Sequence, residues 1–128
     1  MFNLRAITIP LTLALCGAAL TVAPLASAKG GPGVRVRGVC TQGSTAKLKL
    51  SREDSRLEVE FEVDQNRNGV PWKVRLRRNG LLVASTTART HAPSGSFSLR
   101  RLIAGTQGTV TAVATRASGE RCTAQASI

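Results

Sequence analysis

The segment RLEVEFEV, residues 56–63, alternates apolar and charged side chains without interruption. Successive side chains of a β-strand point to opposite faces, so the apolar residues from Leu57 to Val63 share one face, and Arg56 and three glutamates share the other. This period of two is typical of a strand with one buried face. Beyond the apolar N-terminus, no stretch keeps apolar residues at helical spacing for three turns. The sequence therefore predicts an all-β domain.

Other segments repeat this alternation or carry the β-branched residues that strands favour. The pair Asn79-Gly80 supplies the positive-φ turn of a two-residue hairpin, and the polar segment 51–55 is expected to be a second hairpin loop. We expect strands near residues 34–40, 45–50, 56–63, 71–78, 81–86, 96–101, 109–115 and 122–128. Seven to eight short strands separated by frequent turns predict an antiparallel immunoglobulin-like β-sandwich.

Two further expectations follow from the alternation. If the second and third of these strands pair, Lys47 and Lys49 face the glutamates of the partner strand, which stabilises the pair by a few tenths of a kcal/mol per contact. Trp72 continues the inward set formed by Val74 and Leu76, so we expect it to anchor the core. An exposed ligand platform is the alternative role for this tryptophan.

The first 28 residues have the features of an export signal. Arg5 provides a short positive start, a long apolar run follows, and the small residues ASA that end at Ala28 form a cleavage site. We expect residues 1–28 to be a helical signal peptide, residues 29–33 to be a flexible lead-in and residues 34–128 to be the domain. The mature protein is then secreted, either extracellular or associated with the cell envelope.

Two alternatives to a cleaved signal stay open. The apolar run is nearly as long as the roughly 20 residues that cross a bilayer, so the segment could be retained as a membrane anchor. Cys16 could also carry a lipid. Pro10 and Pro24 interrupt the apolar run, and Leu15 is a poor residue before a lipidated cysteine, which favours cleavage.

Cleavage removes Cys16 and leaves Cys40 and Cys122. In an oxidising compartment two cysteines near opposite ends of a small domain indicate one disulfide, here between the first and last strands. Such a bridge closes a loop of about 80 residues and stabilises the fold by about 4.5 kcal/mol in the chain-entropy model.

The charge after residue 28 is strongly positive, because 17 basic and 7 acidic residues remain and the net charge is +10. This balance favours anionic partners or, in the simplest alternative, only keeps the protein soluble. Nucleic acid is disfavoured because the whole chain has one Trp, three Phe and no Tyr to stack on bases. We expect an anionic cell-envelope polymer or an acidic protein as the partner, and no cofactor.

The candidate contacts for an anionic partner are the cations that the alternation places outward or at strand ends. They are Arg35, Arg37, Lys73, Arg75, Arg77, Arg78, Arg100 and Arg101. If these residues fall on one sheet they form a binding face, and if they scatter they do not. The alternative is a structural or protein-binding sandwich that uses a sheet edge or its loops.

Residues 64–75 begin like a calcium-binding EF-hand loop, with Asp64, Asn66 and Asn68 at alternate positions and Gly69 after them. The twelfth position is Arg75, where such a loop needs a bidentate glutamate, and the flanking segments are predicted strands. Asp and Asn side chains also stabilise turns by bonding to the backbone. These residues are therefore weak calcium candidates, and we expect no metal.

Enzymatic chemistry has little support in the sequence. The only histidine, His91, lies in a proline-containing loop, and no free thiol is expected to pair with it. Three of the carboxylates alternate along one strand, which is typical of a solvated ladder and not of a glycosidase pair. We expect a protein that is not an enzyme, with a small secreted hydrolase as the remaining alternative.

Several segments together carry a resemblance to a known group. GVRVRGVC, RLEVEFEVDQNRNG, PWKVRLRRNG, GSFSLRR and ATRASGERC resemble small exported β-sandwich proteins from actinobacteria. The resemblance covers nearly all of the chain after the signal. It implies an immunoglobulin-like fold and secretion, and it assigns no activity.

Overall fold

The computed structural model describes residues 33–128, and the expected signal helix at residues 1–28 lies outside them. Within the described part the regular structure consists of β-strands, and no helix there is long and apolar enough to cross a membrane. The strands are β1 (Val34–Arg37), β2 (Val39–Cys40), β3 (Thr45–Glu53), β4 (Arg56–Asp64), β5 (Pro71–Arg78), β6 (Leu81–Arg89), β7 (Ser96–Ala104), β8 (Thr109–Arg116) and β9 (Arg121–Ser127).

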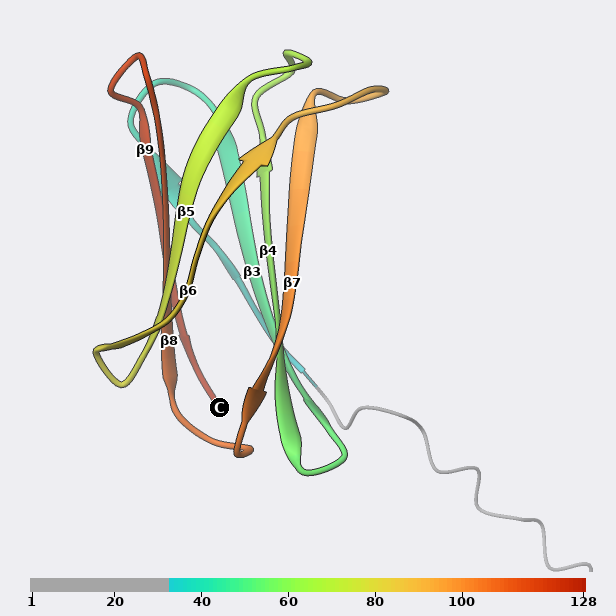
Figure 1. Ribbon diagram of the computed structural model, residues 1–128, viewed down its shortest axis with the longest axis vertical. Coiled ribbons are helices and arrows are strands. Elements are labelled where there is room, and N and C mark those ends of the chain that lie inside the picture. Colours follow the sequence, from blue (N-terminus) through green and yellow to red (C-terminus); the bar gives the residue numbers. More distant parts are fainter. Residues whose placement is uncertain (1–32) are drawn as a thin grey trace, which may run out of the picture.

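The strands form two antiparallel sheets that face each other (Figure 1). Sheet A has the order β1-β3-β4-β7, and sheet B has the order β2-β9-β8-β5-β6. The all-β sandwich predicted from the alternation is therefore confirmed. The number of strands was underestimated, because the segment expected as one strand at residues 34–40 is two strands that belong to different sheets.

Gly38 is the point at which this first segment changes sheets. A Cβ atom there would lie 2.7 Å from the carbonyl oxygen of Thr123 and 2.9 Å from the Cβ of Ala46, so only glycine fits between the two sheets. β1 pairs with β3 before the crossing, and β2 pairs with β9 after it. The N-terminal segment thus closes one side of the sandwich.

The predicted disulfide is present on this closed side. Cys40 and Cys122 are directly opposite each other in β2 and β9, and their sulfur atoms are bonded across 82 residues of chain. The bridge therefore joins the first strand segment of sheet B to the last strand of the domain, as the positions of the cysteines predicted.

The core lies between the sheets and follows the period of two. Sheet A contributes large side chains such as Leu48, Leu57 and Phe61, whereas β8 and β9 contribute mainly alanines. Trp72 is fully buried in sheet B, and its ring centre lies 6.2 Å from that of Phe97. Aromatic pairs at this separation stabilise a core by about 0.5–1.5 kcal/mol beyond their buried area.

The two predicted hairpins are present, with strands longer than expected. In the β3–β4 hairpin Lys47 pairs with Glu62 and Lys49 with Glu60, but the turn is shorter than the expected loop at 51–55 because β3 continues to Glu53. Asn79 and Gly80 connect β5 to β6 with φ angles of 49° and 82°, the positive values that this turn requires.

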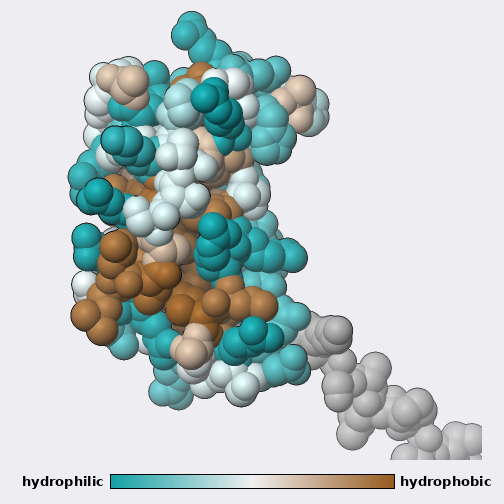
Figure 2. Space-filling model, viewed as in Figure 1, coloured by the Kyte–Doolittle hydropathy of each residue, from teal (hydrophilic) through white to brown (hydrophobic). Residues whose placement is uncertain are grey.

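The opposite side of the sandwich is open in that its edge strands, β6 and β7, do not pair with each other. Figure 2 shows hydrophobic residues gathered over the lower part of this side. The exposed large apolar side chains of these two strands are Leu81, Leu82, Val83 and Leu102. Both edges also present backbone groups that no strand of the described chain pairs.

Candidate functional site

The candidate cations are divided between the two sheets and do not form one patch. Lys73, Arg75 and Arg77 point outward from β5 in sheet B, where each is exposed and the residues between them are buried. Arg35 and Arg37 point outward from β1 in sheet A. Any binding surface must therefore be sought on one sheet or the other.

The outward face of sheet B is built from rows of directly opposite residues. Lys73 of β5 lies between Thr87 of β6 and Thr115 of β8, and Arg121 of β9 follows Thr115 in the same row. The next two rows are Ser85, Arg75, Val113, Thr123 and Leu82, Arg77, Thr111, Gln125. We call the outward side chains of sheet B the basic face.

The basic face contains no carboxylate. Its three rows are made of Lys, Arg, Thr, Ser, Gln, Val and Leu only. Within residues 33–128, the side chains of Lys73, Arg75, Arg77 and Arg121 form no ion pair, because the ion pairs there involve only Arg100 and Arg116. These four positive charges therefore have no carboxylate partner within residues 33–128.

Two shallow hollows mark this face. One, of about 200 Å³, is lined by the four cations together with Val113 and Thr115. A second, of about 340 Å³, shares Lys73 and Thr115 with the first and extends toward Thr87 and Arg116. The four cations thus surround the first depression, which lies over the middle strands of sheet B, and Lys73 also borders the second.

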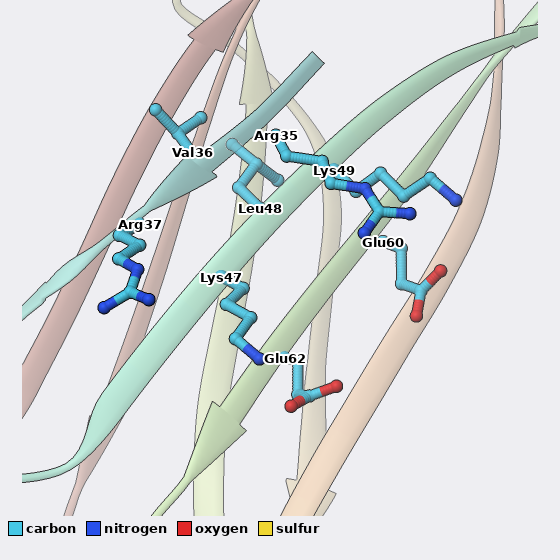
Figure 3. A pocket seen from close by; sticks show the side chains of 8 residues that line it. All are labelled: Arg35, Val36, Arg37, Lys47, Leu48, Lys49, Glu60 and Glu62. Atoms are coloured by element: carbon cyan, nitrogen blue, oxygen red, sulfur yellow. The ribbon is translucent and has the colours of Figure 1, made fainter. Parts of the chain in front are cut away.

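The outward face of sheet A has a different composition, and we call it the mixed face. Figure 3 shows its hollow, of about 460 Å³, in which Arg35 and Arg37 of β1 stand beside Lys47 and Lys49 of β3. Glu60 and Glu62 of β4 form the other border. Each lysine is directly opposite one of these glutamates on one side and one of the arginines on the other, so both signs of charge alternate across this hollow.

Arg100 extends this compensation to β7. Its guanidinium lies 3.6 Å from the carboxylates of both Glu58 and Glu60. A hydrogen bond with Glu53, burial and nearby carboxylates raise the pKa of Glu58, and Arg100 partly offsets this. Arg100 therefore serves the internal charge balance of the mixed face and is a weak candidate for binding a partner.

Arg78 does not belong to the basic face, contrary to the sequence-based assignment. Its guanidinium donates hydrogen bonds to the carbonyl oxygens of Ala104 and Gln107, the second at 2.6 Å. It therefore holds the β7–β8 loop in place. Arg101 is exposed on β7 at a position that alternates with the outward Arg100, on the same side of the strand as Phe97 and Leu99, and it donates to the carbonyl oxygen of Arg100 at 2.9 Å.

Arg121 belongs to the basic face and was missed by the sequence analysis. The segment 116–121 has the composition of a turn, so the last strand was expected to begin at Cys122. β9 begins one residue earlier. The alternation of Cys122, Ala124 and Ala126 with polar residues, extended back by one position, would have placed Arg121 outward.

Glu120 is the carboxylate nearest to the basic face in sequence, and it is fully buried. It accepts hydrogen bonds from the backbone amides of Gln42 and Ser44 at 3.0 Å each, from the Ser44 hydroxyl at 2.7 Å and from Arg116 Nε at 2.9 Å. Burial alone raises the pKa of this carboxyl, but these four donors outweigh burial and lower it. Glu120 thus joins the β2–β3 loop to the β8–β9 turn and leaves the basic face free of negative charge.

The aromatic residues offer no platform for stacking bases within the described chain. Phe61, Phe97 and Trp72 all lie in the core. Trp72 donates from its indole nitrogen to Gln65 at 3.2 Å, and the Arg116 guanidinium lies 5.7 Å from its ring centre on the inner side of sheet B. Trp72 therefore has the role of a core anchor.

The calcium-like segment forms the connection from β4 to β5. Asp64 accepts a hydrogen bond from the backbone amide of Asn66 at 3.0 Å, and Asn66 and Gly69 have φ angles of 60° and 75°. Asn68 is exposed. These residues therefore stabilise a turn, which is the structural role that their side chains often have.

Two further features of the described chain concern chemistry that the sequence raised. His91 is exposed in the β6–β7 connection, and its Nδ1 lies 3.1 Å from the carbonyl oxygen of Arg89. Residues 33–128 contain no group of three or more His, Cys, Asp or Glu side chains placed to hold a metal ion.

Comparison with known proteins adds no assignment. No family model, curated protein or solved structure matches this chain.

Proposed function

We propose that this protein is an exported, non-enzymatic, immunoglobulin-like module that binds an anionic partner, an anionic cell-envelope polymer, through the basic face of sheet B. One observation carries the proposal. Four cations of that face surround a depression, and the face contains no carboxylate, although the domain has seven acidic residues. Positive charge without a counter-charge attracts anions and speeds their association.

The connections between strands support an immunoglobulin-like relationship. β3–β4, β5–β6 and β8–β9 are hairpins within a sheet, whereas the links from β4 to β5, from β6 to β7 and from β7 to β8 pass between the sheets. Such alternation of hairpins and crossings is the Greek-key pattern of immunoglobulin-type sandwiches. The position of the disulfide, between β2 and β9, differs from the inter-sheet bridge of antibody domains.

Export is supported by two features. Residues 1–28 have the composition of a signal peptide. The Cys40–Cys122 bridge also fits an oxidising compartment, where disulfides persist.

The proposal is tested by comparing two variants of equal charge on isolated anionic cell wall. One variant carries Lys73→Gln, Arg75→Gln and Arg77→Gln on the basic face, and its control carries Arg35→Gln, Arg37→Gln and Lys47→Gln on the mixed face. At about 1 kcal/mol for each cation near an anionic surface, the first should lose roughly 100-fold in affinity. The control should lose less than about threefold, because the hollow that these cations line also contains Glu60 and Glu62, which repel an anion.

Rising salt is the second part of this test. Binding through the basic face should weaken as salt screens the charges. Binding that ignores ionic strength, or equal losses in the two triple variants, contradicts the proposal. If the protein retains an acidic protein and not the polymer, the partner is an acidic protein, the other class of partner expected from the net charge.

A second candidate function is supported by the open side of the sandwich. The exposed apolar residues at the start of β6 lie on an edge strand with unpaired backbone groups, which suits a partner protein that adds an apolar β-strand. In that case charge only confers solubility. The single change Leu82→Lys should then abolish capture of the partner, and the triple change on the basic face should leave it intact.

A further inference from the structure

Three of the four cations of the basic face form a row along one strand. Lys73, Arg75 and Arg77 are alternate residues of β5 and point to the same side. Alternate residues of a strand are about 6.7 Å apart, so the row presents three positive charges at a regular interval. The register shift between β5 and β6 comes after Leu76, so the first two positions lie in a regular part of the ladder.

Hydroxyl groups border the row on both sides. Thr87 and Ser85 of β6 are opposite Lys73 and Arg75, and Thr115 of β8 is opposite Lys73 on the other side. A hydroxyl donates one hydrogen bond, and with a cation it can hold two oxygens of one phosphate group. Val113, opposite Arg75 on β8, leaves the centre of the depression without a competing polar group.

Arg121 adds a fourth charge beside the end of the row. It is separated from Lys73 by one strand, β8, which places its backbone about 9.6 Å away across the sheet. The row therefore has one end that is wider and more strongly charged, formed by Lys73 and Arg121. The end at Arg77 has only Thr111 and Gln125 beyond it, and these two side chains bond to each other at 3.2 Å.

Resting on the proposed function, we infer that the ligand is a linear phosphodiester polymer without bases, which lies along β5 with successive phosphates on Lys73, Arg75 and Arg77. A regular row selects a ligand whose charges repeat at a similar interval, and a compact anion can reach only part of it. Poly(glycerol phosphate) has this type of backbone. The burial of Trp72, Phe61 and Phe97 leaves no aromatic surface in the described chain to favour bases.

The test uses purified protein and four probes at equal concentration of negative charge: poly(glycerol phosphate), inositol hexakisphosphate, inorganic polyphosphate and single-stranded oligothymidylate. We expect poly(glycerol phosphate) to bind at least tenfold more tightly than inositol hexakisphosphate. In a plot of the logarithm of the binding constant for poly(glycerol phosphate) against the logarithm of the salt concentration, the slope should become shallower by about 0.7 for each cation removed from the row. Inorganic polyphosphate, with more closely spaced charges, and oligothymidylate should both bind more weakly than poly(glycerol phosphate).

A variant that keeps the charge but breaks the row tests the geometry directly. Arg75→Ser with Ser85→Arg exchanges two directly opposite residues, so the central charge moves from β5 to β6 without any change in composition. Affinity for poly(glycerol phosphate) should fall about fivefold, equivalent to about 1 kcal/mol. Affinity for inositol hexakisphosphate should stay the same. Thermal melting controls for the fold, because both positions are exposed.

The outcomes separate this inference from the proposed function. If inositol hexakisphosphate binds as tightly as the polymer, or the exchange variant is unaffected, the inference is wrong and binding of anions by the basic face still stands. If oligothymidylate binds as tightly as poly(glycerol phosphate), the ligand class is nucleic acid and the inference is again overturned. If none of the probes binds, both proposals fail.

Discussion

The two outer faces of this sandwich use positive charge in different ways. The mixed face of sheet A carries cations and anions in neighbouring strands, so that lysines of β3 face glutamates of β4 and Arg100 contacts two carboxylates. The basic face of sheet B carries cations among hydroxyl-bearing residues and has no anion. The same residue types therefore stabilise the sheet on one side and remain available to a partner on the other.

The acidic residues explain the contrast. Five of the seven lie on the outward positions of β3 and β4, namely Glu53, Glu58, Glu60, Glu62 and Asp64. Asp54 is in the turn between these strands, and Glu120 is buried beneath the end of sheet B. A net charge alone would not reveal this separation, because it depends on where each acid lies.

The largest effect is expected on the free energy of unfolding when the buried Glu120 is replaced. This change tests whether the stability of sheet B depends on a buried carboxylate. Glu120→Gln weakens the bond to Arg116 and the bonds from two backbone amides, and breaking a buried ion pair costs about 3 kcal/mol or more. Chemical denaturation should show this loss. Glu62→Gln on the mixed face is the matched control and should change the free energy of unfolding by less than about 0.5 kcal/mol.

The pH dependence of stability should differ in sign between the two sheets. The pKa of Glu120 is lowered from its ordinary value of 4.5, so its contribution is present above pH 4.5 and is lost as the pH falls through the lowered value. The pKa of Glu58 is raised, so its contribution is present below 4.5 and is lost as the pH rises through the raised value. Denaturation between pH 2 and 7 should lose its acid-sensitive component in Glu120→Gln; an unchanged profile would assign that component to another group.

The next prediction concerns the affinity for an anionic partner. It adds a carboxylate to the basic face, so that this face carries both signs of charge as the mixed face does. Thr115→Glu places a carboxylate between Lys73 and Arg121, its direct neighbours in the row. The new acid neutralises these cations and repels an anionic partner, so affinity for poly(glycerol phosphate) should fall about tenfold, or about 1.4 kcal/mol. Thr115→Gln is the neutral control in the same binding measurement, and a similar loss in both variants would point to shape instead of charge.

The converse change should give the mixed face some affinity for anions. Glu60→Gln with Glu62→Gln removes the negative border of the hollow in Figure 3 and leaves its four cations uncompensated. Total affinity for poly(glycerol phosphate) should rise about threefold to fivefold, about 1 kcal/mol at most. The gain should persist when the triple change Lys73→Gln, Arg75→Gln and Arg77→Gln is added. A gain that disappears in this background comes from long-range attraction to the basic face.

The smallest expected effect is the coupling energy between opposite charges on the mixed face. A double-mutant cycle on Lys47 and Glu62, directly opposite in β3 and β4, should give a coupling of about 0.3 kcal/mol at low salt and less at high salt. The pair Lys73 and Thr115 of the basic face, also directly opposite, should give no measurable coupling. Equal values for both pairs would remove the electrostatic distinction between the two faces.

Much of the fold could be predicted because local patterns specify strands. The alternation of apolar and polar residues identified the strands of both hairpins, and Asn79-Gly80 identified one turn. Strand ends were less predictable, because β3 and β6 continue through polar residues that the hydrogen-bond ladder keeps extended. The ninth strand was missed because the chain crosses from sheet A to sheet B at Gly38. The residues that require a glycine at this crossing, Thr123 and Ala46, are not adjacent to it in the sequence.

The candidate site was predictable only in part. Lys73, Arg75 and Arg77 could be assigned to one strand face from the alternation. Arg121 was missed because its strand begins inside a segment with turn composition, and Arg78 was included because its loop partners, Ala104 and Gln107, lie more than twenty residues away.

Three properties of this protein follow directly from its amino-acid order: which side chains of each strand point inward, the excess of positive charge and the two cysteines that pair. These properties are local or compositional, because a period of two decides the face of a strand wherever the strand lies. The three-dimensional fold was needed to know which cations share a face, which of them have carboxylates as neighbours and where Glu120 is buried. These properties depend on which strands become neighbours, and that choice is made by the packing of segments far apart in the chain.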